Sequence, residues 1–172
     1  MYRGGRLNKL NLEQLQPNVY PVNLLNKCDS GLCLFGAGFY GANDAIHMYN
    51  AGMTVHVVDN DATKIAVMEE MYPNDWVFST ADVTTWAPNT ANNGLLTWDI
   101  VSVDAPQNMF PWVLSNFDEL AKLANKYLVV TMATELAESV AYFCDNLDWE
   151  LVSTMNRSQS GLIELSVFSC LR

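Results

Sequence analysis

The stretch Gly31-Leu-Cys-Leu-Phe35, followed by Gly36-Ala-Gly-Phe-Tyr-Gly41, decides the fold of this chain. A short apolar strand runs into a glycine loop, and the loop leads into a helix that we expect over Ala42 to Asn50. A Gly-x-Gly-x-x-Gly motif in this context is typical of nucleotide binding. The three glycines lack a Cβ, so they permit a tight turn at Gly36, a close ligand approach at Gly38 and helix packing at Gly41.

The composition predicts one compact α/β domain. The chain has 172 residues, of which 50% are hydrophobic and 16% charged, enough apolar material for a core. Its 9 Lys and Arg residues against 19 Asp and Glu residues give a formal charge of −10. That balance argues against electrostatic binding of a nucleic-acid backbone. The four cysteines form no Cys-x-x-Cys motif, which favours reduced thiols in a cytoplasmic protein without a metal site or membrane span.

A second strand is predicted over Thr54 to Val58, and it ends at Asp59. Asp59 follows Gly41 by 18 residues, a spacing that places a carboxylate beside the glycine loop. There it can accept hydrogen bonds from both ribose hydroxyls of an adenosine-containing ligand. Either Asn60 or Asp61 can cap the next helix, so we favour the ribose role for Asp59 over capping.

Two later strands carry further acids to the same edge of the sheet. Trp76 to Phe78 is the third strand and is followed by Asp82, which can contact a ligand or serve as a turn residue. The fourth strand, Ile100 to Val103, leads into Asp104. The sequence further predicts a surface loop over Pro88 to Thr97, helices over Phe110 to Leu123 and Glu135 to Leu147, and a fifth strand over Tyr127 to Thr131.

The end of the chain separates folds that share this beginning. Trp149 to Val152 and Leu162 to Phe168 are strand-like and lie close together in sequence. A connection this short cannot hold the crossover that parallel strands require, so an antiparallel hairpin is expected. This hairpin argues against a nicotinamide-dependent (NAD) oxidoreductase, which remains an alternative because it uses the same glycine loop and Asp59.

Over residues 31 to 169 the chain resembles class I S-adenosylmethionine-dependent methyltransferases, and more weakly small members carried by viruses. The resemblance implies a three-layer Rossmann-like fold, with a mostly parallel seven-stranded sheet and an antiparallel terminal hairpin. It implies that the glycine loop holds the methionine part of S-adenosylmethionine, Asp59 the ribose, and Asp82 with Val83 the adenine. The cofactor-binding residues expected on this basis are Phe35, Gly36, Ala37, Gly38, Phe39, Gly41, Asp59, Asn60, Asp82, Val83 and Asp104.

Asp104-Ala-Pro-Gln107 occupies the place where amino-group methyltransferases of this family often have an Asp/Asn-Pro-Pro-aromatic motif. Ala105 replaces the first proline and Gln107 replaces the aromatic residue, so the stacking platform for a nucleobase is absent. Asp104 is the candidate catalytic residue that orients the methyl acceptor, with a cofactor or capping contact as the alternative.

The sequence thus predicts a flanking segment or lid over residues 1–30 and a single S-adenosylmethionine-binding domain over 31–172. The expected function is methyl transfer to a small molecule or a protein, with a nucleic acid disfavoured. A methyltransferase-like fold kept as an inactive binding or assembly module is the non-enzymatic alternative. For His47 and His56, packing is favoured over catalysis.

Overall fold

The computed structural model describes residues 27–37, 44–72, 76–133, 149–156 and 163–170, with side chains described up to residue 130. The chain divides into two compact units, Met1–Val83 and Thr84–Arg172. Three predictions fall wholly or partly outside the described residues: residues 1–26 of the flank or lid predicted over 1–30, the loop residues Gly38, Phe39 and Gly41, and the helix over Glu135 to Leu147.

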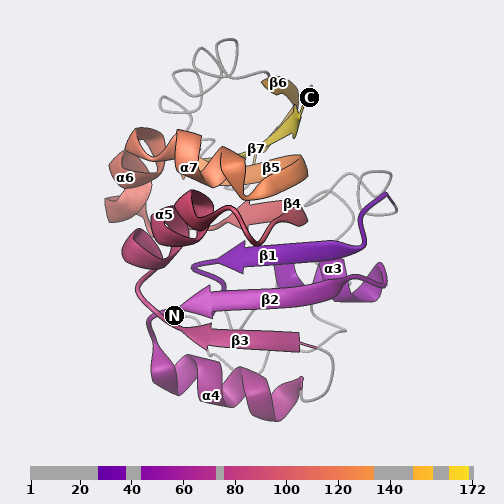
Figure 1. Ribbon diagram of the computed structural model, residues 1–172, viewed down its shortest axis with the longest axis vertical. Helices are drawn as coiled ribbons and strands as arrows, with labels where there is room; N and C mark the ends of the chain where they lie inside the picture. The colour runs from indigo at the N-terminus through magenta and orange to yellow at the C-terminus, as the bar shows by residue number, and fades with distance from the viewer. Residues whose placement is uncertain (1–26, 38–43, 73–75, 134–148, 157–162, 171–172) are drawn as a thin grey trace. The chain divides into compact units, whose positions relative to one another are not determined.

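The first unit contains a parallel sheet of the strands β1 (Ser30–Leu34), β2 (Thr54–Asp59) and β3 (Trp76–Thr80). β2 pairs in parallel with both neighbours, so β2 lies in the middle. Figure 1 shows the three arrows side by side and pointing the same way. The carboxyl ends of the strands therefore meet at one edge, and the predicted second strand ending at Asp59 is confirmed.

Two helices connect these strands, α3 (Asp44–Asn50) and α4 (Ala62–Met71). Ile46 and Met48 of α3 and Met68 of α4 are completely buried, so each helix packs an apolar face into the core of this unit. The Cys33 thiol of β1 lies 3.6 Å from the Met48 sulfur. At the start of β3, the indole of Trp76 stacks on the Tyr72 ring with the ring centroids 4.3 Å apart.

The second unit contains β4 (Trp98–Val103) paired in parallel with β5 (Ala124–Ala133). β7 (Ile163–Cys170) pairs antiparallel with β5, and β6 (Trp149–Asn156) pairs antiparallel with β7. Between β4 and β5 lie a 3-10 turn, η1 (Gln107–Met109), and two short helices, α6 (Phe110–Ser115) and α7 (Phe117–Lys122).

The predicted surface loop over Pro88 to Thr97 is wrong in its first half, because α5 spans Val83–Asn93 with Pro88 inside it. Val83, Ala87 and Ala91 recur every four residues and are all buried, so one face of the helix packs into the core. This burial outweighs the backbone hydrogen bond that Pro88 cannot donate. Tertiary packing therefore overrides the turn-forming composition of the segment.

The single helix predicted over Phe110 to Leu123 is also wrong, since it is broken between α6 and α7 at Asn116. The Asn116 backbone has φ −114° and ψ 21°, and its side-chain amide donates a hydrogen bond to the Trp112 carbonyl oxygen over 2.9 Å. An asparagine that bonds the backbone in this way competes with helix continuation. The third strand, by contrast, is longer than predicted and runs to Thr80.

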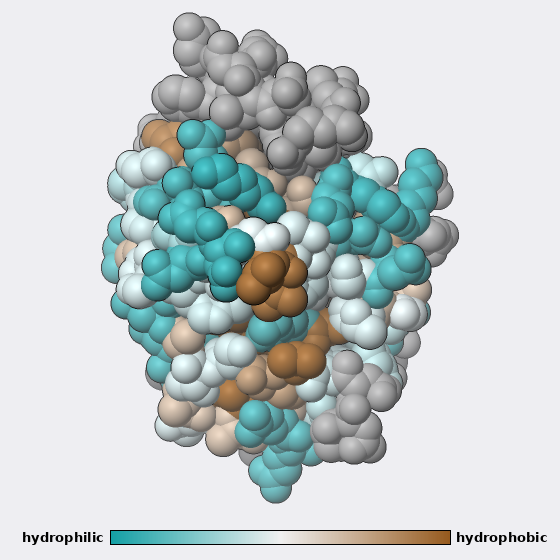
Figure 2. Space-filling view, in the orientation of Figure 1, coloured by the Kyte–Doolittle hydropathy of each residue, from teal (hydrophilic) through white to brown (hydrophobic). Residues whose placement is uncertain are grey.

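Among the described residues the exposed large hydrophobic side chains are Val77, Leu95 and Leu96. On the face shown in Figure 2, hydrophobic residues form small separate groups among hydrophilic ones. The helices within the described residues are all too short or too polar to cross a membrane.

Candidate functional site

The turn after β1 is shaped by close packing at Gly36. A Cβ added at this position would lie 2.8 Å from Val57 Cγ1 and 2.9 Å from both the Cβ and the carbonyl oxygen of Cys33. These separations are shorter than carbon atoms tolerate, so only glycine fits between β1 and β2 here. The left-handed backbone conformation falls instead on Phe35, with φ 57°. Gly36 thus lies in the predicted turn, and the lack of room for a Cβ is the physical reason for glycine at this position.

Asp59 lies at the carboxyl end of β2 and reaches back to this turn. Its side chain is buried, with 8% of the residue exposed. One carboxylate oxygen, Oδ2, accepts a hydrogen bond from the Ala37 backbone N–H over 3.0 Å. The other, Oδ1, accepts one from the Asp61 N–H over 2.9 Å. The main-chain oxygen of Asp59 accepts the Ala81 N–H over 2.9 Å, so this residue bonds to the turns after β1, β2 and β3.

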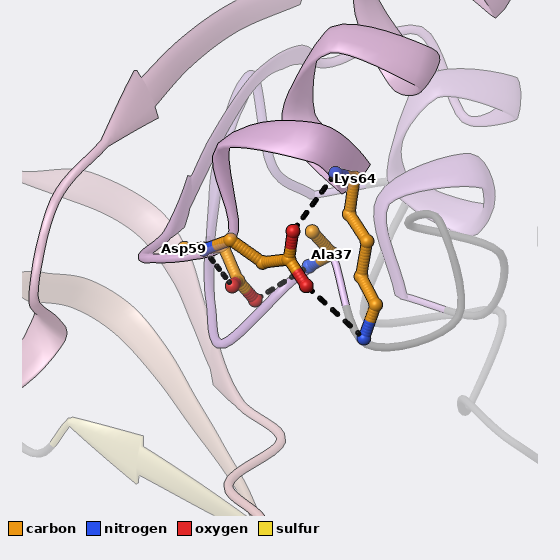
Figure 3. A network of polar contacts seen from close by, with 4 residues as sticks. Ala37, Asp59 and Lys64 are labelled. Carbon is orange, nitrogen blue, oxygen red and sulfur yellow. Dashed lines mark hydrogen bonds and ion pairs between the residues drawn. The ribbon is translucent and has the colours of Figure 1, made fainter.

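The next helix is capped by Asp61, which resolves the choice between Asn60 and Asp61. The Asp61 carboxylate accepts the Lys64 backbone N–H over 3.1 Å, as an N-cap residue does. The Lys64 ammonium lies 3.7 Å from the same carboxylate. Figure 3 shows Ala37, Asp59 and Lys64 around this network. Sequence reasoning missed Lys64, although the Asp-x-x-Lys spacing at the start of a helix was a usable signal.

Asp82 and Val83 follow β3 where α5 begins. Asp82 is exposed and directly precedes the helix, whereas Val83 is the first helical residue and is buried. Asp82 is thus accessible at the same edge of the sheet as Asp59, since Asp59 is the last residue of β2 and Asp82 follows the carboxyl end of the neighbouring parallel strand β3.

Asp104 belongs to the second unit and follows the last residue of β4. It is half-buried between the buried residues Val103 and Ala105. Pro106 then caps the turn η1, because its carbonyl oxygen accepts the Met109 N–H over 2.8 Å. Gln107 is exposed at the position where the resembling motif has an aromatic residue.

His56 of β2 forms a contact that the sequence did not predict. Its Nε2 lies 2.8 Å from the Ser79 hydroxyl on β3. Burial lowers the pKa of His56 below its usual value of 6.5, because a charged imidazolium is poorly solvated there. In the part of the chain for which side chains are described, no cluster of three or more His, Cys, Asp or Glu residues is arranged to hold a metal ion.

The chain is similar in structure to solved proteins from which it differs widely in sequence, including the following three. Magnesium protoporphyrin IX methyltransferase from Synechocystis, solved with bound S-adenosylmethionine, is 16% identical; the match covers 96% of this chain and 80% of that one, with a TM-score of 0.66. The fibrillarin pre-rRNA processing protein of Methanococcus jannaschii is 13% identical, with 98% and 76% covered and a TM-score of 0.63. An O-methyltransferase from Bacillus cereus, solved with S-adenosylhomocysteine, is 10% identical, with 93% and 86% covered and a TM-score of 0.62.

No model of a known protein family matches the sequence, and no curated protein matches it. The structural matches show that the chain has the α/β Rossmann-like fold of class I S-adenosylmethionine-dependent methyltransferases. They give no support to the weaker resemblance to virus-encoded members.

Proposed function

We propose that this protein binds S-adenosylmethionine at the carboxyl ends of β1, β2 and β3 and transfers its methyl group to an acceptor. The observation that carries the proposal is the buried Asp59 carboxylate beside the turn at Gly36 and Ala37. A carboxylate at this position of a Rossmann-like fold is placed to accept hydrogen bonds from the two hydroxyls of a ribose.

The hydrogen-bond acceptors of the site fit the ribose of an adenosine. An ionised carboxylate offers about four acceptor positions on its two oxygens. In Asp59 one position on each oxygen is used by a backbone N–H, which leaves one on each oxygen for the ribose diol. Asp82 and Val83 are proposed to contact the adenine, and Phe35, Gly36, Gly38, Phe39, Gly41 and Asn60 to surround the remainder. When bound, the cofactor supplies an electron-poor methyl group.

Asp104 is proposed to orient the acceptor and to accept a hydrogen bond from it. Transfer to a positioned acceptor needs alignment and exclusion of water more than covalent chemistry from the protein. The half-buried position of Asp104 after β4 supports this role, since a partly desolvated carboxylate forms strong hydrogen bonds.

The acceptor class is proposed to be a small molecule or a protein side chain. The matched proteins act on different partners, so the fold leaves this choice open. The charge of −10 and the replacement of the aromatic residue by Gln107 both disfavour a nucleic acid. Methyl transfer to RNA in a screen of candidate acceptors would contradict this part of the proposal.

The proposed organisation of the chain is a single S-adenosylmethionine-binding domain over residues 31–172 that ends in the antiparallel pair of β6 and β7. Residues 1–30 are proposed to form a flanking segment or lid, whose last residue, Ser30, is already the first residue of β1. Support comes from the strand pairings within each unit and from matches that cover 93% to 98% of this chain.

Calorimetric titration with S-adenosylmethionine, S-adenosylhomocysteine and NAD tests the cofactor. Binding of the first two alone is expected, and Asp59→Ala should abolish it. Glu70→Gln is the matched control, because it removes one negative charge from an exposed position on α4 of the same unit. Binding of NAD alone would instead favour an oxidoreductase.

The second candidate is a methyltransferase-like binding module without catalysis, which the departures Ala105 and Gln107 favour. Turnover of S-adenosylmethionine with extracts of candidate acceptors separates the two. Asp104→Asn should lower turnover while the affinity for the cofactor changes little, with Asp118→Asn on the exposed side of α7 as control. Cofactor binding without turnover on any acceptor would favour the module.

A further inference from the structure

Asp59 connects the three turns that form the proposed cofactor site. Its carboxylate accepts N–H groups from Ala37, after β1, and from Asp61, in its own turn. Its main-chain oxygen accepts the N–H of Ala81, after β3. All these residues belong to the first unit. The two side-chain bonds are charge-assisted, which makes them stronger than bonds between neutral groups.

The bond to Ala37 is the long-range one, because the two residues lie 22 positions apart. Ala37 is completely buried, and a buried backbone N–H requires an acceptor. The Asp59 carboxylate is that acceptor. Its hydrogen bond is therefore part of what fixes the turn after β1, together with the longer bond of 3.3 Å from the Gly36 N–H to the Val58 oxygen.

The turn itself has an unfavourable backbone conformation. Phe35 has φ 57°, in the left-handed region that residues other than glycine rarely adopt. Such a conformation persists only where surrounding contacts hold it. Asp59 fixes Ala37, two residues further on, and so restrains the turn from its other end.

We propose that Asp59 is a positioning residue as well as a ribose ligand: it holds the turn from Phe35 to Ala37 in its binding conformation before any cofactor arrives. The Ala37 N–H then stays bonded to Asp59 and does not contact the cofactor. This inference rests on the proposed function for its ligand, and it replaces the direct cofactor contact expected of Ala37 by an indirect role.

Amide hydrogen exchange measured by NMR without cofactor tests the positioning role. In the unsubstituted protein the Ala37 amide should exchange slowly. Asparagine at 59 keeps the size of the side chain but has a single acceptor oxygen. In Asp59→Asn the amide of Ala37 or of Asp61 should therefore exchange at least about tenfold faster, and in Asp59→Ala both should.

Strand amides separate this effect from general loss of structure. The amides of Leu32 and Val57 are expected to stay slow in Asp59→Asn, and Glu70→Gln should leave every one of these rates unchanged. An Ala37 amide that remains as slow in Asp59→Ala as in the unsubstituted protein would overturn the proposal. If the variants do not fold, the unsubstituted protein alone still tests the proposal. An Ala37 amide that exchanges there as fast as in an unfolded chain would overturn it.

A second measurement adds S-adenosylmethionine to the unsubstituted protein. Exchange at Ala37 should then change less than twofold, because its N–H is already bonded; a further slowing of about tenfold or more would mean a direct cofactor contact and refute the indirect role. Failure of S-adenosylmethionine to bind would contradict the proposed function, whereas the exchange rates without cofactor decide the positioning role independently.

Discussion

Replacing Gly36 by alanine tests whether close packing between β1 and β2 fixes the glycine loop. The new methyl group would meet Val57 Cγ1 at 2.8 Å and the Cys33 Cβ and carbonyl oxygen at 2.9 Å. Val57 and Cys33 are buried, with 0% and 2% exposed, and the carbonyl oxygen belongs to the backbone of β1. Relief of the clash therefore requires a strand shift rather than a side-chain rotation.

Overpacking a core by one methyl group destabilises by about 1 to 3 kcal/mol, and the backbone contact places Gly36→Ala at about 3 kcal/mol. Gly94→Ala is the matched control. Gly94 has φ 68° with nothing within 4 Å of an added Cβ, so its substitution introduces backbone strain of about 1 to 2 kcal/mol without a clash. The two variants separate lack of space from lack of conformational freedom.

Urea denaturation followed by tryptophan fluorescence measures both variants, with the change in free energy taken from the midpoint at constant slope. Gly36→Ala should lose clearly more stability than Gly94→Ala. The double variant Gly36→Ala with Val57→Ala should be less destabilised than the sum of the single variants, because removal of Cγ1 frees one of the three contacts. Equal losses in Gly36→Ala and Gly94→Ala would refute the packing argument.

Three further outcomes are expected. Asp61→Ala should destabilise by about 1 kcal/mol through loss of the cap on α4, whereas Asp61→Asn should lose little, as thermal unfolding will measure. Burial lowers the pKa of His56 in the folded protein below 6.5, so His56 binds a proton more readily in the unfolded chain than in the folded one. The stability that comes from neutral His56 is therefore present above pH 6.5 and is lost as the pH falls through the lowered pKa. The free energy of unfolding, measured by denaturation between about pH 8 and about pH 5, should therefore depend less on pH in His56→Gln than in the unsubstituted protein. The same pH dependence in both proteins would contradict this. The buried Tyr72 hydroxyl has no hydrogen-bond partner among the described residues, so Tyr72→Phe should be neutral or stabilising, and a loss of more than about 1 kcal/mol would reveal a missing partner.

Local patterns in the sequence were sufficient for much of the first unit. The β-branched run before Asp59 predicts a buried parallel strand, and the structure places β2 over Thr54–Asp59. Asp61 could be identified as one of two capping candidates because capping depends on residues within one helical turn. These features need only neighbouring residues, so periodicity and side-chain chemistry specify them.

Where the local composition of a segment disagrees with its burial in the folded protein, composition predicts the wrong element. The segment after Val83 is rich in asparagine and contains Pro88, which predicts a loop, yet α5 continues to Asn93. Its buried residues Ala87 and Ala91 become informative only once the surface that they pack against is known. Tertiary burial decides such a segment because the free energy of core contacts exceeds that of local propensity.

The sequence by itself determined that a glycine loop follows a buried strand and that an acid ends the next strand. Only the tertiary structure decided what these residues do to one another. Gly36 is required because Val57, 21 positions away, fills the space of a side chain, and Asp59 bonds to Ala37 across 22 positions. Contacts between residues so far apart depend on the register between β1 and β2, which no local pattern of residues specifies.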